Sequence, residues 1–306
     1  MITKIFKKNL PGPAKIINGS TIASKILEEY KYKINKLIQD SGTRPGLGII
    51  QIGDRHDSNI YIQKKLQASC KIGVDAFLFK YDKNISKNQV LDKIIELNND
   101  PKINGIITQL PLEISNRFDY TDLTNLVVPE KDVDCLSSSC YNNLCNHKFL
   151  ENFVPCAANA CLKILESINC SIAGKRVVIL GSSKLVGLPL KHLMEFKKAD
   201  TFLCDKTTKD LKFLCQTADI LIVAIGCSQF INADYIKPGA VVIDVGINYD
   251  ETNRKVTGDV HFEQALQKAS YITPVPGGVG PVTVSMLMMN TYKAALKHHR
   301  NKISHG

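Results

Sequence analysis

Residues 176–196 read RVVILGSSKLVGLPLKHLMEF, and this stretch decides the fold. The apolar run 176–180 predicts a buried strand, and 188–196 predicts a helix on the far side of a tight turn. Glycines in such a turn, Gly181 and Gly187 here, let the backbone approach a pyrophosphate, and the first turn of the helix supplies unpaired N–H groups. We therefore interpret the stretch as the opening unit of a Rossmann-like dinucleotide-binding domain, with a plain tight connection as the alternative.

Strand and helix patterns alternate on both sides of this unit. Ser86 and Gln89 form a capping box that opens one of the helices. Strand–helix alternation at this spacing implies parallel pairing and an α/β fold. The other predicted strands are 47–52, 74–80, 103–109, 201–204, 220–225, 241–245 and 271–273, and the main predicted helices are 58–71, 86–97 and about 282–298.

The length of the chain allows two domains. It has 306 residues, 44% of them hydrophobic, which is enough for two separate cores. We expect one α/β domain over 1–154 and the Rossmann-like domain over 155–281, with a cleft between them. The C-terminal helix in 282–306 is expected to pack back on the first domain. The polar stretch 129–151 shows no clean period, and we interpret it as a functional loop.

Charge and hydropathy restrict the partners. Lysine and arginine exceed aspartate and glutamate by 39 to 29, a net charge of +10 that suits anionic molecules. Because the lysines are spread rather than massed with aromatic residues, we expect no nucleic-acid partner. No apolar run approaches the roughly 20 residues of a membrane-spanning helix, so no membrane partner is expected either.

Ten cysteines occur without any Cys-x-x-Cys pair. Zinc sites favour such pairs, and disulfide frameworks belong to small secreted chains, so we expect free thiols and no metal. Cytoplasm is the default compartment. The basic start, Met1 to Lys8, leaves a short mitochondrial-type leader as an alternative.

Three side chains of the 58–71 helix share one face, because Ser58, Tyr61 and Lys65 stand at i, i+3 and i+7. An aromatic ring near an amine offers a platform for a flat ring whose edge the amine can reach. The alternative is a solvated helix face, since Lys64 and Lys71 show that lysine is common here.

Further candidates follow predicted strands, where ligands of α/β proteins gather. Gln109-Leu110-Pro111 ends one strand, and Asp205 ends another, in the position from which an acid commonly accepts ribose hydroxyls. Asp132 and Asp134 lie in the polar stretch, where a simple turn signal is the alternative. Residues 274–281 hold three prolines and three glycines, which indicates a stiff loop that can approach a ligand closely.

Taken together, these segments resemble the methylenetetrahydrofolate dehydrogenase/cyclohydrolase family from about Ile17 to Leu296. The first half carries Pro45 to Asp54, Ser58-x-x-Tyr61-x-x-x-Lys65, Gln109-Leu110-Pro111-Leu112 and Pro129-x-Lys131-Asp132-Val133-Asp134. The second half carries Val186-Gly187-x-Pro189, PGAVVIDVGIN at 238–248, Gly258-Asp259-Val260 and residues 271–283.

The resemblance implies an enzyme of one-carbon metabolism, which supports purine biosynthesis. Hydride would pass from 5,10-methylenetetrahydrofolate to NADP or NAD, and water would convert the methenyl product to 10-formyltetrahydrofolate. The first domain would bind the folate, and the positive charge would suit a folate tail of several glutamates. A homodimer and a reaction without metal are also implied.

The same resemblance assigns roles to residues. Lys65 would activate water or relay a proton, and Gln109 would hydrogen-bond Lys65 and adjust its acid–base properties. Tyr61 would stack on the folate. Asp134 would bind the aminopyrimidine edge of the pterin. The other implied folate contacts are Ser58, Leu110, Pro111, Pro276, Gly277 and Gly278. The implied cofactor contacts are Gly181, Ser182, Ser183, Val186, Gly187, Asp205, Lys206, Ile247 and Thr283.

Three positions depart from the family pattern. Ser182 replaces an arginine that typically grips the 2′-phosphate of NADP. Asp205-Lys206 replaces His-Ser, and the aspartate would repel a phosphate that the lysine could hold, so the choice between NAD and NADP stays open. Cys135 takes the place of a glycine after Asp134, which indicates an altered affinity for folate.

Two other functions are alternatives. A two-domain amino-acid or quinate-type dehydrogenase would share the cofactor half but leave Gln109 and Asp134 unexplained. A catalytically idle folate- or nucleotide-binding protein would account for Ser182 and for the unusual stretch 135–145.

Overall fold

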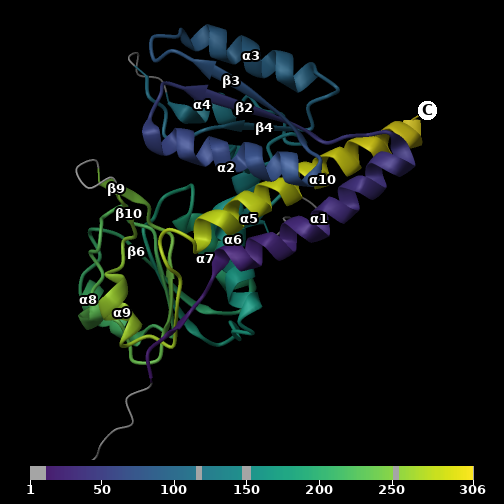
Figure 1. Cartoon of the computed structure of the whole chain (residues 1–306). Helices are drawn as coiled ribbons and strands as arrows, with labels where there is room; N and C mark the ends of the chain where they lie inside the picture. Colours follow the sequence, from purple (N-terminus) through teal and green to yellow (C-terminus); the bar gives the residue numbers. More distant parts are fainter. Residues whose placement is uncertain (1–11, 115–118, 147–152, 251–254, 306) are drawn as a thin grey trace, which may run out of the picture.

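The computed structural model describes residues 12–114, 119–146, 153–250 and 255–305. It forms two α/β halves connected by long helices (Figure 1). The first half is built on a three-stranded parallel sheet in the order β3-β2-β4. The central strand β2 (Gly46–Ile52) is buried along its length, and it lies between β3 (Asp75–Tyr81) and β4 (Gly105–Thr108).

Helices cover both faces of this sheet. Side chains alternate across a strand, so neighbouring residues of β2 enter different cores. Ile49 belongs to the core that includes α2 (His56–Ile72), whereas Ile50 belongs to the core that includes α3 (Lys87–Asn99). The capping box of Ser86 with Gln89 at the start of α3 is confirmed. Helix α2 therefore lies on the Ile49 face of the sheet (Figure 1).

The second half is built on a six-stranded sheet in the order β1-β11-β8-β7-β5-β6, with parallel pairing throughout. Its glycine turn connects β5 (Arg176–Leu180) to α7 (Gly187–Phe196), as expected. The other strands of this sheet are β1 (Lys15–Ile16), β6 (Asp200–Cys204), β7 (Ile220–Val223), β8 (Val241–Asp244) and β11 (Tyr271–Ile272). The remaining elements are α8 (Leu211–Thr217), a short 3-10 helix (Ala233–Tyr235), α9 (Phe262–Leu266) and the hairpin of β9 (Asn248–Asp250) with β10 (Lys255–Thr257).

The last helix, α10 (Val279–His305), returns to the first half. It packs along α1 (Gly19–Ser41) and also contacts α2 and α6 (Cys156–Ser167) (Figure 1). Its N-terminus therefore lies at the junction of the two halves, directly after the proline-glycine loop.

Two expectations from the sequence are wrong. Strand β1 pairs with β11, so Lys15–Ile16 belongs to the second sheet although the expected boundary placed 1–154 in the first domain. The stretch 129–151 is not a loop throughout, because α5 (Ser138–Cys145) lies within it. Ser137 caps this helix, and the buried Cys140 and Leu144 stand one turn apart, a spacing that the polar neighbours obscured. Residues 147–152 and Met1 to Lys8 lie outside the described residues.

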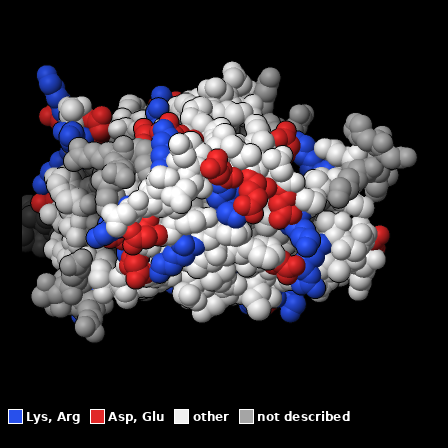
Figure 2. Space-filling view, turned by 90° about the horizontal axis from the view of Figure 1, so that it is seen from above, with Lys and Arg blue, Asp and Glu red and all other residues white. Residues whose placement is uncertain are grey.

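Three further features concern the thiols, the surface charge and the hydropathy of the helices. All ten cysteines are free thiols. On the face shown in Figure 2, basic and acidic side chains alternate and form no continuous basic surface. In the described part of the chain, no helix has the length and apolar character required to cross a membrane.

Candidate active site

Lys65 of α2 and Gln109 at the end of β4 form a hydrogen-bonded pair. The Lys65 Nζ donates to the Gln109 Oε1 at 2.9 Å. The Gln109 Nε2 donates to the Leu110 carbonyl oxygen at 2.7 Å. Because its nitrogen is engaged by the backbone, the amide must present its oxygen to the lysine. The structure therefore brings together the two residues that were expected to act as a pair.

Burial changes the acid–base properties of this lysine. Desolvation of the amine lowers the pKa of Lys65, and the neighbouring Asp134 and Cys156 oppose this shift. A lysine with a lowered pKa has a larger neutral fraction near neutral pH, and only the neutral amine can accept a proton. The pair is thus suited to proton transfer. Cys156, which the sequence did not single out, adjoins Lys65 and Asp134 in the same group of side chains.

Asp134 is half-buried, and other residues hold its segment in place. The buried Asp132 accepts a hydrogen bond from the Ser137 backbone N–H at 2.9 Å. From α10, the Asn290 Nδ2 donates to the Val133 carbonyl oxygen at 2.9 Å. Of the two aspartates, Asp132 thus stabilises the loop, and Asp134 is the carboxylate that interacts electrostatically with Lys65.

Cys135 occupies a backbone conformation that favours glycine. Its φ is 60°, in the left-handed region where a side chain causes strain. Its side chain is nevertheless buried, with the Sγ 3.4 Å from the Phe153 carbonyl oxygen. The departure from the family pattern therefore places a cysteine in a glycine-type backbone directly after Asp134.

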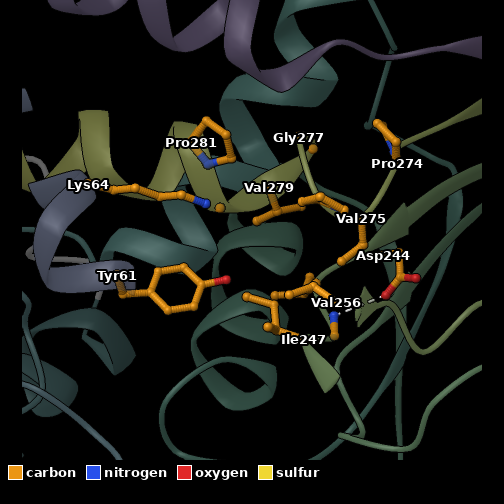
Figure 3. Close-up of a pocket in the computed structure, with 15 residues that line it drawn as sticks. Tyr61, Lys64, Asp244, Ile247, Val256, Pro274, Val275, Gly277, Val279 and Pro281 are labelled. Atoms are coloured by element: carbon orange, nitrogen blue, oxygen red, sulfur yellow. Dashed lines mark hydrogen bonds between the residues drawn. The ribbon is translucent and has the colours of Figure 1, made fainter. Parts of the chain in front are cut away.

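Tyr61 lines a pocket at the start of α10 (Figure 3). Its ring and hydroxyl are close to Gly280, since a Cβ built on that glycine would lie 3.8 Å from both. The Lys64 Nζ lies 5.5 Å from the centroid of the ring. Burial raises the pKa of Tyr61 to about 12, so the phenol stays protonated. The other lining residues are 244–247, Val256 and 274–281.

The remaining residues expected around the proline-glycine loop differ in what they do. Ile247, Pro276 and Gly277 line the same pocket as Tyr61. Gly278 also borders it, but a Cβ there would come within 2.4 Å of the Pro274 carbonyl oxygen, so packing demands this glycine. Thr283 is not among the lining residues, and its hydroxyl donates to the Val279 carbonyl oxygen at 3.1 Å within α10.

Ser58 is buried in the first turn of α2, one turn before Tyr61. Its hydroxyl has no hydrogen-bond partner among the residues that the structure describes. Leaving a buried hydroxyl unpaired costs roughly 1–3 kcal/mol, so a ligand with a polar atom at this position would remove a penalty. This agrees with Ser58 as a ligand contact.

The glycine turn has no room for side chains at its two ends. A Cβ on Gly181, whose φ is 106°, would lie 2.1 Å from the Ala224 carbonyl oxygen. A Cβ on Gly187 would lie 1.6 Å from the Gly181 carbonyl oxygen. The first turn of α7 is consequently pressed against the end of β5, where its N–H groups can receive a phosphate. The close approach of the helix start to the strand end therefore fits a bound dinucleotide.

Ser182 and Ser183 are exposed within the turn, where a ligand can reach them. The Ser183 hydroxyl accepts a hydrogen bond from the Val186 backbone N–H at 3.2 Å, which stabilises the turn before the helix begins. Ser182 is the position where the family arginine is missing, so the chain offers a small neutral side chain there.

Asp205 stands at the end of β6, beside this turn, since the Gly181 N–H donates to the Cys204 carbonyl oxygen at 2.8 Å. The Thr207 hydroxyl and backbone N–H both donate to the Asp205 Oδ1, at 2.7 and 2.8 Å. These hydrogen bonds, led by that of the Thr207 hydroxyl, lower the pKa of Asp205. A fixed negative charge therefore adjoins the glycine turn, and the exposed Lys206 follows it.

An apolar hollow of about 530 Å³ lies between the two halves. Leu110 and Pro111, which the resemblance assigned to the substrate, line it, and Leu185 borders it from the glycine turn. Sequence reasoning missed Leu185 and Tyr120, because nothing in a single chain shows which residues face each other across a domain junction. The other lining residues are Leu112, Ile114 and Asp119.

Two buried carboxylates, Asp244 and Asp259, fix the loop that carries Ile247. Sequence reasoning did not place them in the site, although an acid that directly follows an apolar strand, as in VVID, was an available signal. Each carboxylate accepts several backbone hydrogen bonds, so the pair ties the end of β8 to the turns around it. The backbone donors are Gly246, Asp259 and Val260 for Asp244, and Ile225, Gly226 and Cys227 for Asp259.

This pair makes stability depend on pH. Burial raises the pKa of Asp244 to about 7, from 3.8 in an exposed chain. The folded state therefore binds a proton that the unfolded state lacks, and stability falls as pH rises towards 7. Between pH 5.5 and 8 we expect Asp244 to account for a loss of about 2 kcal/mol in the free energy of unfolding. Urea unfolding at both pH values checks this, since the Asp244→Asn variant should lose less over the interval than the wild type, and equal losses would contradict it.

In the described part of the chain, no group of histidine, cysteine, aspartate and glutamate side chains is arranged to hold a metal ion. The geometry instead combines a Rossmann-like glycine turn, a lysine–glutamine pair and an apolar hollow at the junction of two α/β halves. These features define a class, namely a two-domain dinucleotide-dependent enzyme with its site between the domains.

Comparison with known families makes the assignment specific. Residues 17–134 match the model described as "Tetrahydrofolate dehydrogenase/cyclohydrolase, catalytic domain". Residues 155–299 match the model described as "Tetrahydrofolate dehydrogenase/cyclohydrolase, NAD(P)-binding domain". The chain belongs to the tetrahydrofolate dehydrogenase/cyclohydrolase family. The resemblance drawn from the motifs is thereby confirmed, and the amino-acid or quinate-type dehydrogenase is set aside.

Individual relatives agree with this assignment. The chain is 41% identical over 276 residues to the "Bifunctional protein FolD" of Caldicellulosiruptor saccharolyticus, covering 90% of this chain and 98% of that protein. It is 42% identical over 289 residues to the "C-1-tetrahydrofolate synthase, cytoplasmic" of Rattus norvegicus, covering 92% of this chain and spanning only 31% of the length of that relative.

Solved structures show the same two-domain fold. The bifunctional methylenetetrahydrofolate dehydrogenase/cyclohydrolase of Campylobacter jejuni superposes with a TM-score of 0.87 at 36% identity, covering 93% of this chain and 99% of that one. The Trypanosoma brucei dehydrogenase-cyclohydrolase, solved with NADP and an inhibitor, gives 0.88 at 33% identity, covering 96% and 99%. The expected α/β architecture, with a catalytic domain and an NAD(P)-binding domain, is confirmed.

Proposed function

We propose that this chain oxidises 5,10-methylenetetrahydrofolate with a nicotinamide dinucleotide and hydrolyses the methenyl product to 10-formyltetrahydrofolate. The observation that carries the proposal is the Lys65–Gln109 pair, a lysine of lowered pKa held in one orientation. The names of the similar FolD proteins and the titles of the solved structures support both reactions.

In the oxidation step the protein acts mainly by positioning. A bound dinucleotide supplies a hydride acceptor at its nicotinamide ring. Tyr61 provides a flat protonated ring for the folate, and the Pro276–Gly277 loop closes the opposite side of the same pocket. The one-carbon unit of the folate is thereby held near the nicotinamide. Hydride transfer then takes place between two bound groups in a fixed geometry and does not depend on an encounter in solution.

In the hydrolysis step Lys65 moves a proton. The neutral amine accepts a proton from the water that attacks the methenyl carbon, so that a C–O bond forms. Opening of the ring then breaks one C–N bond, and the amine gives its proton to the departing nitrogen. The hydroxyl oxygen becomes the formyl carbonyl and its proton passes to solvent, so the overall hydrolysis releases one proton. Gln109 keeps the amine oriented by accepting one of its N–H bonds, at 2.9 Å.

The other candidate contacts hold the folate. Asp134 offers a carboxylate to the paired donors of the aminopyrimidine ring. The hollow beside Leu110, Pro111 and Leu185 suits the flat benzoyl part of the molecule, because its lining is mostly apolar. The Ser58 hydroxyl is a polar group available to either ligand.

The test uses the purified protein and two substrates separately. With methylenetetrahydrofolate and a dinucleotide, we expect reduction of the cofactor, measured at 340 nm. With methenyltetrahydrofolate alone, we expect its absorbance to disappear faster than in buffer. Folate binding in calorimetry without either reaction would instead identify a catalytically idle binding protein.

We further propose that the chain prefers NAD to NADP. Asp205 carries a fixed negative charge at the end of β6, which would accept ribose hydroxyls and repel a 2′-phosphate. Ser182 supplies no positive charge in its neighbourhood. Lys206 and Lys184 favour a phosphate, but both are exposed, where solvent weakens their attraction.

Removing the negative charge of Asp205 should shift the preference from NAD towards NADP. In Asp205→Asn the Thr207 hydrogen bonds can persist while the repulsion disappears. We expect the ratio of kcat/KM for NADP to that for NAD to rise about tenfold. Asp210→Asn, an exposed aspartate of the same loop, serves as the matched control. An unchanged ratio in Asp205→Asn would exclude this carboxylate as the selector.

Assembly, location and domain limits complete the proposal. We expect a homodimer, a folate with several glutamates, and a role in one-carbon metabolism that feeds purine biosynthesis. A cytoplasmic location is supported by the names of the rat and human C-1-tetrahydrofolate synthases. The folate-binding domain would comprise the first half up to residue 154 with α10, and the dinucleotide-binding domain would comprise 155–281 with β1 added.

A further inference from the structure

A second group of reactive side chains meets where α5 packs against α7 (Figure 1). The Cys145 Sγ lies 3.4 Å from the His192 Nε2. The Tyr141 hydroxyl lies 3.4 Å from the same nitrogen. On the opposite side of the imidazole ring, the His192 Nδ1 lies 3.8 Å from the Glu195 Oε2. A thiol, an imidazole and a carboxylate therefore follow one another in space, and none of them serves the folate reactions.

This order is the one that an activated thiol requires. A base within reach of the sulfur can take its proton, and a third group on the other ring nitrogen orients that base. The Glu195 carboxylate lies on the Nδ1 side, beyond hydrogen-bond distance, where its negative charge stabilises the imidazolium that forms when Nε2 takes the proton. Burial raises the pKa of Tyr141, so its phenol remains a neutral neighbour of the ring.

Accessibility combined with the imidazole contact distinguishes Cys145 from the other cysteines. Cys145 and Cys170 are half-exposed, whereas Cys135, Cys140 and Cys156 are buried. Cys70 and Cys227 are more exposed still, but within the described residues neither contacts an imidazole. Among the described residues, Cys145 is thus an accessible thiol with an imidazole beside it, and the exposed Cys70 and Cys227 serve as internal references.

We propose that Cys145 is a modification site, a nucleophilic thiol that reacts with small electrophiles such as alkylating agents and hydroperoxides. In alkylation by iodoacetamide the sulfur attacks carbon, a C–S bond forms, the C–I bond breaks, and the proton of the thiol passes to His192. With hydrogen peroxide an S–O bond forms and the O–O bond breaks, so the sulfur is oxidised to a sulfenic acid and the peroxide is reduced to water. Glu195 is a positioning residue in both reactions.

The experiment compares the alkylation rates of individual cysteines in the intact protein. Native enzyme is treated with limiting iodoacetamide near pH 7, and peptide mass spectrometry measures labelling at Cys145, Cys70 and Cys227. Because His192 lies within reach to take the thiol proton as the C–S bond forms, we expect Cys145 to react about tenfold faster than the two references. In denatured protein the three rates should become equal, because the advantage depends on the fold.

Two variants link the rate to the contacts. His192→Gln should reduce labelling at Cys145 to the level of Cys70, and Glu195→Gln should reduce it partly, while both retain the fold by circular dichroism and the oxidation of methylenetetrahydrofolate. A second readout, trapping of sulfenic acid with dimedone after peroxide treatment, should follow the same order. Labelling of Cys145 no faster than that of Cys70 and Cys227, or unchanged labelling in His192→Gln, would overturn the proposal.

Discussion

The Lys65→Met variant should lose hydrolysis of methenyltetrahydrofolate, with a fall in kcat of at least about 100-fold. Methionine keeps the length and apolar stem of the side chain but removes the amine that accepts the proton. The loss should be confined to the chemical step. The Lys65 Nζ donates to Gln109 and lies near Asp134, and the variant removes these polar contacts while it keeps the apolar stem of the side chain. Stopped-flow measurement of the decay of methenyltetrahydrofolate with enzyme in excess checks the expectation.

Lys71→Met provides the matched control, because Lys71 is an exposed lysine in the last turn of the same helix. It should retain the hydrolysis rate of the wild type. If Lys65→Met hydrolysed at a near-normal rate while Lys71→Met did the same, the amine could not be the group that moves the proton.

The Asp134→Asn variant should bind the folate more weakly by about 2 kcal/mol, an increase of roughly 30-fold in KM. The exchange preserves the shape of the side chain but removes the charge that pairs with an aminopyrimidine. It should leave the KM for the dinucleotide unchanged, because the glycine turn lies in the other half of the molecule. Steady-state kinetics with each substrate varied in turn separates the two constants.

The same variant should also change the pH dependence of hydrolysis. The negative charge of Asp134 raises the pKa of Lys65 against the effect of burial. Removing that charge lowers the pKa further, so the amine becomes neutral at lower pH, and the acidic limb of the rate profile should move down the pH scale. Glu130→Gln, an exposed acid of the preceding turn, should show neither effect. A limb displaced to higher pH would refute the electrostatic coupling.

Local chemistry explains why much of this molecule can be predicted from its sequence. The strand–turn–helix unit at Gly181 to Gly187 is recognisable because both glycines meet a steric demand that no other residue satisfies. That signal lies within a few residues of the feature that it predicts. The pairing of Lys65 with Gln109, which stand 44 residues apart, was expected only from the resemblance to a known family.

Features that depend on distant contacts escaped prediction. Strand β1 has only two residues, and its place beside β11 is determined by pairing partners more than 250 residues further along the chain. The helical spacing of the buried residues in α5 could not be recognised in the sequence, because the residues of its exposed face are polar. Asp244 and Asp259 acquire their role only when the turns that donate to them are folded around them.

The most direct test is a crystal structure of the protein with a folate analogue and the dinucleotide both bound. We expect the Lys65 Nζ to keep its hydrogen bond to Gln109 and to lie about 3–4 Å from the one-carbon position of the analogue, within reach for proton transfer directly or through one water. An amine turned towards bulk solvent, with the one-carbon position on the far side of Tyr61, would contradict the mechanism.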